Sequence, residues 1–172
     1  MLENLKLEKR ILEESNSDFI TRLHSSFRDE KHYYIVMEWA QGGDVQSFLV
    51  EGSERKKQFL MNKEDSIRFI LGCVILGLEY LHSKNIVYSD LKSSNILVFD
   101  DGYAKLADFG VSKQLKENVP CTFQNGTARY FAPEMVIGSQ CGRYVDLWAL
   151  GVLAYYLSNY RFPFQTEDIN VA

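Results

Sequence analysis

The densest group of chemically useful side chains in this 172-residue sequence lies at residues 90–95. Asp90, Lys92 and Asn95 place a carboxylate, an ammonium group and a carboxamide within this short stretch. Apolar residues come directly before it, at 86–87, and directly after it, at 96–98. This pattern predicts a polar loop between two buried segments, carrying a proton acceptor, a cation and an oxygen donor.

Two further motifs follow this loop at fixed distances. Asp108-Phe109-Gly110 begins 18 positions after Asp90, and Ala132-Pro133-Glu134 comes later. In this order the three motifs resemble the catalytic loop, the metal-binding triplet and the Ala-Pro-Glu marker of the eukaryotic protein kinases. A single triplet is weak evidence, but the spaced set is specific and the resemblance covers nearly the whole chain. The other matching positions are Gly126, Thr127, Tyr130 and residues 146–151.

The resemblance implies a chemistry for the polar loop. Phosphoryl transfer needs positioning and neutralisation of phosphate charge more than covalent help from the protein. By resemblance, Asp90 would accept the proton of the substrate hydroxyl, and Lys92 would place a positive charge near the transferring phosphate. Asn95 and Asp108 would bind Mg²⁺, which prefers oxygen ligands and arrives together with ATP.

The resemblance also places the nucleotide-binding residues. Met37 corresponds to the gatekeeper, and the backbone of Glu38 and Ala40 would hydrogen-bond the adenine edge. Asp44 would accept hydrogen bonds from the ribose, and Leu97 would form the floor beneath the adenine. Asp44 also has a second interpretation that is compatible with the first, because an Asp before residues 45–49 is a good helix N-cap.

Two more residues gain a role only from the resemblance, which is nearest to the cyclic-nucleotide-dependent kinases. Glu8, in Glu8-Lys9-Arg10-Ile11-Leu12, would be the ion-pairing glutamate of the regulatory helix, although an isolated Glu on a helix is usually a solvated charge. Thr127 would bridge the catalytic loop and the peptide substrate. Lys92 and the Gly126-Thr127 pair match the serine/threonine pattern, so the implied substrate is a protein hydroxyl.

Hydrophobic periodicity predicts the elements that position these residues. We expect an α+β, kinase-like fold: a partial small lobe over 1–40, made of one helix and a β-hairpin, and a mainly helical large lobe over 41–172. The expected helices span 2–14, 63–83 and 143–158, the middle one buried nearly all round, with a loop over 51–57. The expected hairpins pair 19–27 with 33–38 and 96–99 with 103–106.

Composition excludes several other classes of protein. A net charge of −4 argues against a nucleic-acid binder. Three cysteines with no Cys-x-x-Cys spacing suggest neither a disulfide framework nor a zinc site, which favours a cytoplasmic, reducing setting. The apolar run at 69–78 is shorter than the roughly 20 residues of a membrane span, so none is expected. The sequence indicates no oligomeric state.

The departures from the family pattern leave a second function class open. No Gly-rich loop or lysine-bearing strand precedes Glu8, and the chain ends soon after residue 164, so we expect a fragment that is inactive alone. Tyr88 and Ser89 stand where the family usually has histidine and arginine. The alternative to an active kinase is therefore a pseudokinase that acts as a binding or scaffolding module. Ser89 also lacks the charge that would pair with a phosphate, so we do not expect phosphorylation near Thr122 to be the main switch.

Overall fold

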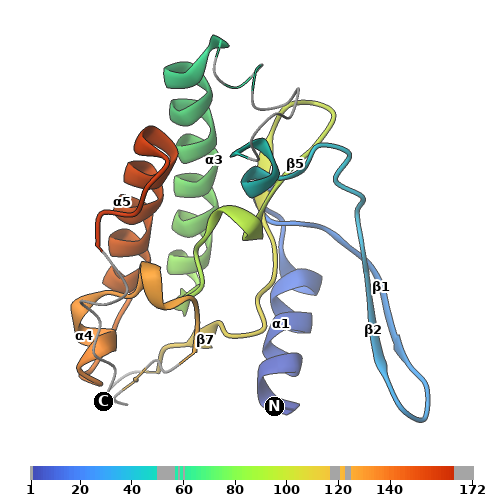
Figure 1. Ribbon diagram of the computed structural model, residues 1–172. Helices are drawn as coiled ribbons and strands as arrows, with labels where there is room; N and C mark the ends of the chain where they lie inside the picture. The colour runs from blue at the N-terminus through green and yellow to red at the C-terminus, as the bar shows by residue number, and fades with distance from the viewer. Residues whose placement is uncertain are drawn as a thin grey trace.

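The computed structural model describes residues 2–49, 57, 59, 61–116, 121–122 and 125–164. Two long helices, α3 (Lys63–Ser83) and α5 (Tyr144–Asn159), pack against each other on one side of the molecule (Figure 1). Both helices were predicted within one residue of their ends. α3 has acidic residues in its first turn and a histidine in its last turn, which complement the helix dipole. Most of the loop expected over 51–57, and the last residues of the expected large lobe, lie outside the described residues.

The expectation that α3 is buried nearly all round is wrong. The helix packs on α5, β6 and β4, but Phe69, Ile75 and Leu76 are each close to half exposed. These packing partners do not cover the whole circumference of the helix, so the face that carries the three exposed residues stays open. Among the described helices, α3 is the one long and apolar enough to cross a membrane by length and composition; core helices of soluble proteins also meet that criterion, so this is weak evidence.

A small antiparallel sheet carries the two loops that matter for the site. β5 (Ile96–Val98) pairs with β6 (Ala104–Leu106), with Leu97 opposite Lys105, and β3 (Gly43–Asp44) pairs with the other edge of β5. Gly102 takes the positive φ that the predicted turn between β5 and β6 requires. Because the polar loop comes directly before β5 and Asp108 comes just after β6, this hairpin places the two on neighbouring loops.

The N-terminal region consists of α1 (Leu2–Glu14), β1 (Leu23–Arg28) and β2 (Tyr33–Met37). The helix has the predicted bounds, and Ile11 and Leu12 point its apolar face into the core. The first strand was expected from residue 19 but begins at Leu23. Ile20 instead forms a parallel bridge to Leu106, and this long-range pairing takes the residues before Leu23 out of the hairpin.

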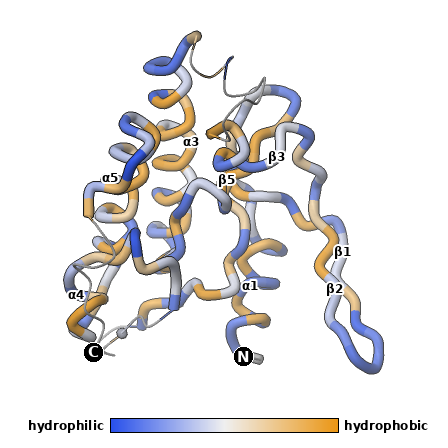
Figure 2. The backbone as a smooth tube through the Cα atoms, viewed as in Figure 1, coloured by the Kyte–Doolittle hydropathy of each residue, from blue (hydrophilic) through white to orange (hydrophobic). Residues whose placement is uncertain are grey.

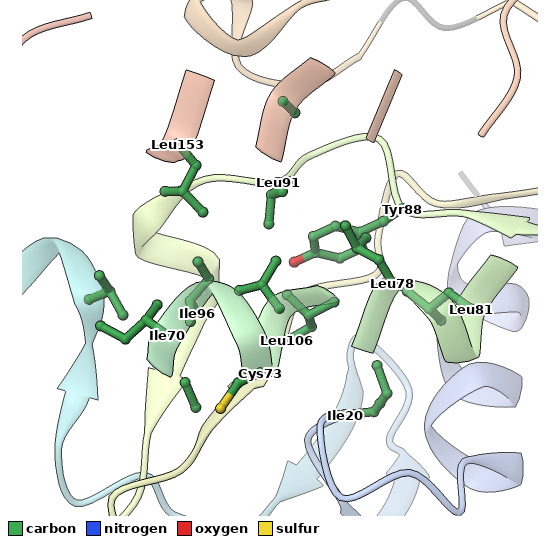
Figure 3. Close-up of a cluster of buried hydrophobic side chains, with 14 of the residues drawn as sticks. Ile20, Ile70, Cys73, Leu78, Leu81, Tyr88, Leu91, Ile96, Leu106 and Leu153 are labelled. Atoms are coloured by element: carbon green, nitrogen blue, oxygen red, sulfur yellow. The ribbon is translucent and has the colours of Figure 1, made fainter. Parts of the chain in front are cut away.

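Short elements complete the α+β fold, which the structure confirms. They are the 3-10 helices η1 (Val45–Leu49), η2 (Ser93–Asn95) and η3 (Ala128–Tyr130), the helix α4 (Pro133–Val136), and the paired strands β4 (Ile86–Val87) and β7 (Lys113–Gln114). The main core joins side chains from α1, α3, α5 and the sheet around Tyr88 and Leu106 (Figure 3). Hydrophilic residues gather at the tip of the β1–β2 hairpin, far from this core (Figure 2).

Candidate active site

Asp90 lies at the centre of the polar loop, between β4 and η2, and its side chain is almost fully buried. Its Oδ1 accepts a hydrogen bond from Thr127 Oγ1 at 2.9 Å. Its Oδ2 accepts from Lys92 Nζ at 2.6 Å and from Asn95 Nδ2 at 3.1 Å. The structure therefore brings together four residues that the sequence analysis assigned to the site. Three donors, one of them the Lys92 ammonium, hold the carboxylate in one orientation.

The backbone of this loop is anchored by Asp146 on α5. This fully buried carboxylate accepts hydrogen bonds from Tyr88 N at 2.9 Å and Ser89 N at 2.8 Å. Its Oδ2 also lies 2.7 Å from His82 Nε2, at the end of α3. His82 is thus a structural partner of Asp146. Ser89 has a φ of 64°, a left-handed conformation that a non-glycine residue holds only when its surroundings enforce it.

Tyr88 and Phe109 join the polar loop to the loop after β6. Their ring centroids are 5.4 Å apart, and both side chains are fully buried in the core cluster that also contains Leu12. The Tyr88 hydroxyl donates to the carbonyl oxygen of Ala107. Burial, helped by the negative charges of Asp108 and Asp90, raises the pKa of Tyr88 well above 10.0, so the phenol remains a donor.

The second acidic position, Asp108, is exposed and has a φ of 58°. Its Oδ1 accepts a hydrogen bond from Gly110 N at 3.2 Å. Glu8 on α1 lies close by and accepts a hydrogen bond from the backbone N–H of Phe109. Burial, and secondarily the charge of Asp108, raises the pKa of Glu8 above 4.5. A cation would be stabilised at this place, because it would lie between two neighbouring carboxylates.

Asn95 and Asp108 fit a magnesium ion by the chemistry of their donors. Both Nδ2 hydrogens of Asn95 are directed at Asp90, one to its backbone oxygen and one to its carboxylate, which turns the carboxamide oxygen away from that residue. One carboxylate and one carboxamide oxygen suffice for Mg²⁺, which keeps water and phosphate oxygens as its other ligands. In the described part of the chain, no three His, Cys, Asp or Glu side chains form a cluster that could hold a metal. The donor set thus resembles a metal site shared with phosphate groups.

The residues expected to bind the adenine edge, Glu38 and Ala40, follow β2. The Glu38 carboxylate makes two contacts of 2.9 Å with Lys105 Nζ and accepts from Arg22 N at 2.8 Å, so its side chain braces this segment against β6. Asp44 Oδ1 accepts from Ser47 N at 2.8 Å, which confirms its N-cap interpretation.

The remaining residues predicted to bind the nucleotide lie on β2, on β5 and in the segment between β2 and β3. Leu97 stands opposite Asp44 in the β3–β5 pair. Ala40 accepts a backbone hydrogen bond from Gly43 at 3.1 Å, and Met37, at the end of β2, is partly exposed. Their roles in nucleotide binding stay predictions.

Gly126 lies where the segment before η3 crosses the polar loop. Its φ is 132°, and a Cβ atom there would lie 2.9 Å from the Phe131 ring and 3.0 Å from the carbonyl oxygen of Ser89. Any larger residue would push this segment away from the polar loop. The Gly126-Thr127 pair thus combines a close backbone approach with the Thr127 hydrogen bond to Asp90.

Sequence analysis missed a second group of residues beside Asp90. Ser93 Oγ donates to Gln46 Oε1 at 2.5 Å, and Gln46 Nε2 donates to the Tyr156 hydroxyl at 3.1 Å. Gln46 and Tyr156 are 110 positions apart and belong to no motif, so no local signal connected them. Arg129 and Phe162 extend this group and were also not predicted.

Comparison with known proteins gives a consistent result. The model of the protein kinase domain matches residues 1–172. A cGMP-dependent protein kinase, isozyme 1, of Drosophila melanogaster is 37% identical over 166 residues, covering 96% of this chain and 21% of that protein. A probable serine/threonine-protein kinase of Dictyostelium discoideum is 39% identical over 166 residues, covering 96% and 35%. A cGMP-dependent protein kinase of Plasmodium berghei (strain Anka) is 38% identical over 165 residues, covering 96% and 18%. The chain thus spans between about a fifth and a third of the length of these relatives.

Proposed function

The chain belongs to the protein kinase family, and on that premise we propose that it is part of a serine/threonine kinase that transfers a phosphoryl group from Mg-ATP to hydroxyl groups of proteins. The observation that carries this proposal is the arrangement around Asp90, whose carboxylate is held by Thr127, Lys92 and Asn95. The named relatives, two cGMP-dependent kinases and a serine/threonine kinase, support the choice of hydroxyl substrate. In this proposal residues 1–40 belong to the small lobe and residues 41–172 to the large lobe.

Asp90 is the proposed proton acceptor. An acceptor hydroxyl placed beside its carboxylate would be oriented toward the γ-phosphorus of ATP. The hydroxyl oxygen forms the new bond to phosphorus, its proton passes to Asp90, and the bond from phosphorus to the bridging oxygen of ADP breaks. Because Thr127 and Lys92 fix the carboxylate from two sides, little reorganisation is needed when the hydroxyl arrives.

The other polar residues act on charge and position. Lys92, which lies 2.6 Å from Asp90 in the structure, would place its ammonium near the transferred phosphoryl group. Asn95 and Asp108 would hold Mg²⁺, which when bound neutralises negative charge on the phosphate oxygens. Glu8, half-buried beside Asp108, is suited to pair with a cation that also contacts phosphate.

The nucleotide base would lie against the segment between β2 and β3, residues 38–42. We assign adenine recognition to the backbone of Glu38 and Ala40, the floor to Leu97, and the gatekeeper position to Met37. Asp44 would accept from the ribose hydroxyls. Its carboxylate already caps η1 through Oδ1, and the second oxygen is the one proposed to contact ribose.

The test compares two aspartate variants in the full-length protein. Asp90→Asn should lower phosphoryl transfer to a protein substrate by about 10²- to 10⁴-fold while sparing nucleotide binding, since Asp90 serves the hydroxyl. Asp108→Asn should weaken Mg-ATP binding itself. Asp100→Asn, an exposed residue in the β5–β6 turn, is the matched control and should change neither.

Two results would contradict the proposal. Transfer at the wild-type rate by Asp90→Asn would remove Asp90 from the chemistry. Mg-ATP binding by the wild-type protein without any transfer would favour the pseudokinase alternative. Transfer is measured with labelled ATP and binding by calorimetry, so the two outcomes are independent.

A further inference from the structure

A connected group of side chains lies next to Asp90, on the side of the polar loop that faces η1, η3 and α5. We call it the substrate-side wall, and its members come from four segments that are far apart in the sequence. They are Gln46, Ser93, Arg129, Tyr130, Tyr156 and Phe162.

The wall is tied directly to the proposed catalytic residues. Ser93 belongs to η2, between Lys92 and Asn95, and is almost fully buried. On the other side, Thr127 donates to Asp90 and is also the residue from which η3 begins, so Arg129 follows it by two positions. The wall therefore adjoins the carboxylate that a substrate hydroxyl would reach.

The polar groups of the wall satisfy one another without charge. Ser93, Gln46 and Tyr156 form a chain of neutral hydrogen bonds. Burial raises the pKa of Tyr130, so this phenol is neutral at physiological pH. Phe162 stacks on Tyr156 at 4.4 Å between centroids and meets Tyr130 edge-on at 5.3 Å. A guanidinium or ammonium from a substrate would find no carboxylate in this network.

The charges at the edge of the wall are positive. Arg129 is exposed, and its guanidinium carbon lies 5.1 Å from the centroid of the Phe162 ring, a cation–π contact that restricts its position. Lys92 is a quarter exposed. Asp90 accepts from three donors and Asp44 caps η1, so the oxygens of these two carboxylates are largely held by neighbouring groups. Among the six members of the wall, Arg129 carries the one charge, and it favours negative charge on a substrate beside it.

We infer that, if the proposed kinase activity is correct, this wall selects protein substrates with an acidic residue close to the acceptor hydroxyl, and that Arg129 is the residue that determines this preference. Carboxylates on the substrate pair with the guanidinium, which offers planar, two-pronged hydrogen bonding. Basic residues at the same place are disfavoured by repulsion from Arg129 and Lys92.

The inference is tested with three peptides that share one acceptor serine and differ only in having glutamate, glutamine or lysine on either side of it. Binding to the full-length protein is measured by fluorescence anisotropy, which requires no turnover. We expect the glutamate peptide to bind about three- to tenfold more tightly than the lysine peptide at low salt, with the difference shrinking at high salt. Equal binding, or tighter binding of the lysine peptide, would overturn the inference.

Variants separate Arg129 from the general charge of the protein. Arg129→Glu should abolish or reverse the preference, and Arg129→Lys should keep most of it. Arg68→Glu is the matched control, because Arg68 is also an exposed arginine and lies on α3, where it pairs with Glu64 and Asp65. If Arg68→Glu changes the preference as much as Arg129→Glu does, Arg129 is not the determinant.

The same peptides distinguish this inference from the proposed function. Asp90→Asn should lose transfer to all three peptides while keeping the order of their affinities. A wild-type protein that binds the glutamate peptide best but transfers nothing would support the inference and contradict the proposed function. Efficient transfer with a preference for the lysine peptide would support the proposed function and contradict the inference.

Discussion

The β1–β2 hairpin and the loop around Asp90 are both short polar turns between strands, but they are held in opposite ways. The hairpin extends away from the rest of the molecule (Figure 1). Its turn is closed by its own residues: Asp29 Oδ1 accepts from Lys31 N at 2.7 Å and from His32 N at 2.6 Å. The polar loop instead depends on Asp146, which lies 58 positions after Tyr88.

The side chains of the hairpin are also much less buried than those beside the polar loop. Phe27 and Tyr33 of the hairpin are each more than half exposed, whereas Tyr88 and Phe109 are fully buried. A turn closed by its own side chains needs no other element, but it also gains no rigidity from the core. The proposed catalytic residues lie where distant elements converge, which is the arrangement that can hold a carboxylate in one orientation.

The largest expected effect is in Asp146→Ala. Removing this buried carboxylate leaves the N–H groups of Tyr88 and Ser89 without an acceptor, so the free energy of unfolding should fall by about 3–5 kcal/mol. Urea unfolding followed by circular dichroism measures the loss. The hairpin counterpart, Asp29→Ala, should only increase amide exchange near Lys31 and His32. Comparable global destabilisation by both variants would mean that the two turns are not held differently.

Core truncation should show a somewhat smaller contrast. Leu106→Ala removes a fully buried side chain and should cost about 2–5 kcal/mol of stability. Val36→Ala, in the exposed part of β2, should cost less than about 1 kcal/mol. Thermal unfolding of the two variants side by side gives the difference. If Val36→Ala is as damaging as Leu106→Ala, the hairpin is packed against something that its exposure does not reveal.

Loss of one hydroxyl should be measurable only in the buried region. Tyr88→Phe leaves the Ala107 carbonyl without its donor and should cost about 1–2 kcal/mol. Tyr33→Phe, whose hydroxyl accepts a hydrogen bond from Arg28 on the surface, should change stability by less than about 0.5 kcal/mol. Because the pKa of Tyr88 is raised in the folded state, the unfolded chain ionises first and stability falls as the pH rises above 10.0. Tyr88→Phe should reduce that fall.

A weaker pH effect is expected at Glu8. Its pKa is raised above 4.5 by burial and by Asp108, so the folded protein holds this proton more tightly than the unfolded chain. Stability should therefore decrease as the pH rises from 4.5 through the folded-state pKa, and the penalty should remain at neutral pH. Glu8→Gln should be more stable than wild type at pH 7, by less than about 1 kcal/mol because the group is half exposed, and equal to it at low pH. A variant that is less stable at pH 7 would indicate that Glu8 already has a cationic partner.

The smallest effect is expected at Thr122. This residue is exposed, Lys113 Nζ donates to its backbone oxygen, and the Ser89 hydroxyl donates to the carbonyl oxygen of Val111 at 2.9 Å. The contact between Ser89 of the polar loop and Val111 is neutral and needs no phosphate. Thr122→Ala and phosphatase treatment should each change the kinase activity of the full-length protein by less than about twofold. A loss of orders of magnitude would show that phosphorylation here is the switch.

Much of the local structure was predictable because its signals are local. The apolar spacing of α1 and α3 gave their bounds, and Gly102 marked the turn between β5 and β6. The start of β1 was not predictable in this way. The residues before Leu23 pair with Leu106 instead of with the hairpin: Ile20 forms a bridge to it, and Thr21 Oγ1 donates to its carbonyl oxygen, 85 positions away. The expectation that α3 is buried nearly all round failed for a similar reason. The sequence shows which residues of a helix are apolar, but it does not say which element, if any, packs on them.

The sequence by itself determined which chemical groups accompany Asp90. Lys92 and Asn95 follow it within five positions, and the spacing of the motifs adds Asp108 and Thr127. Only the tertiary structure decided how these groups are held and what surrounds them. The anchoring of the polar loop by Asp146 and the wall joining Gln46 to Tyr156 arise from the packing of α5 beside α3 and η1. Contacts between residues 58 to 110 positions apart depend on how complete elements pack together. The periodicity of side chains reports only which face of an element is apolar, and it does not say which other element will pack on that face.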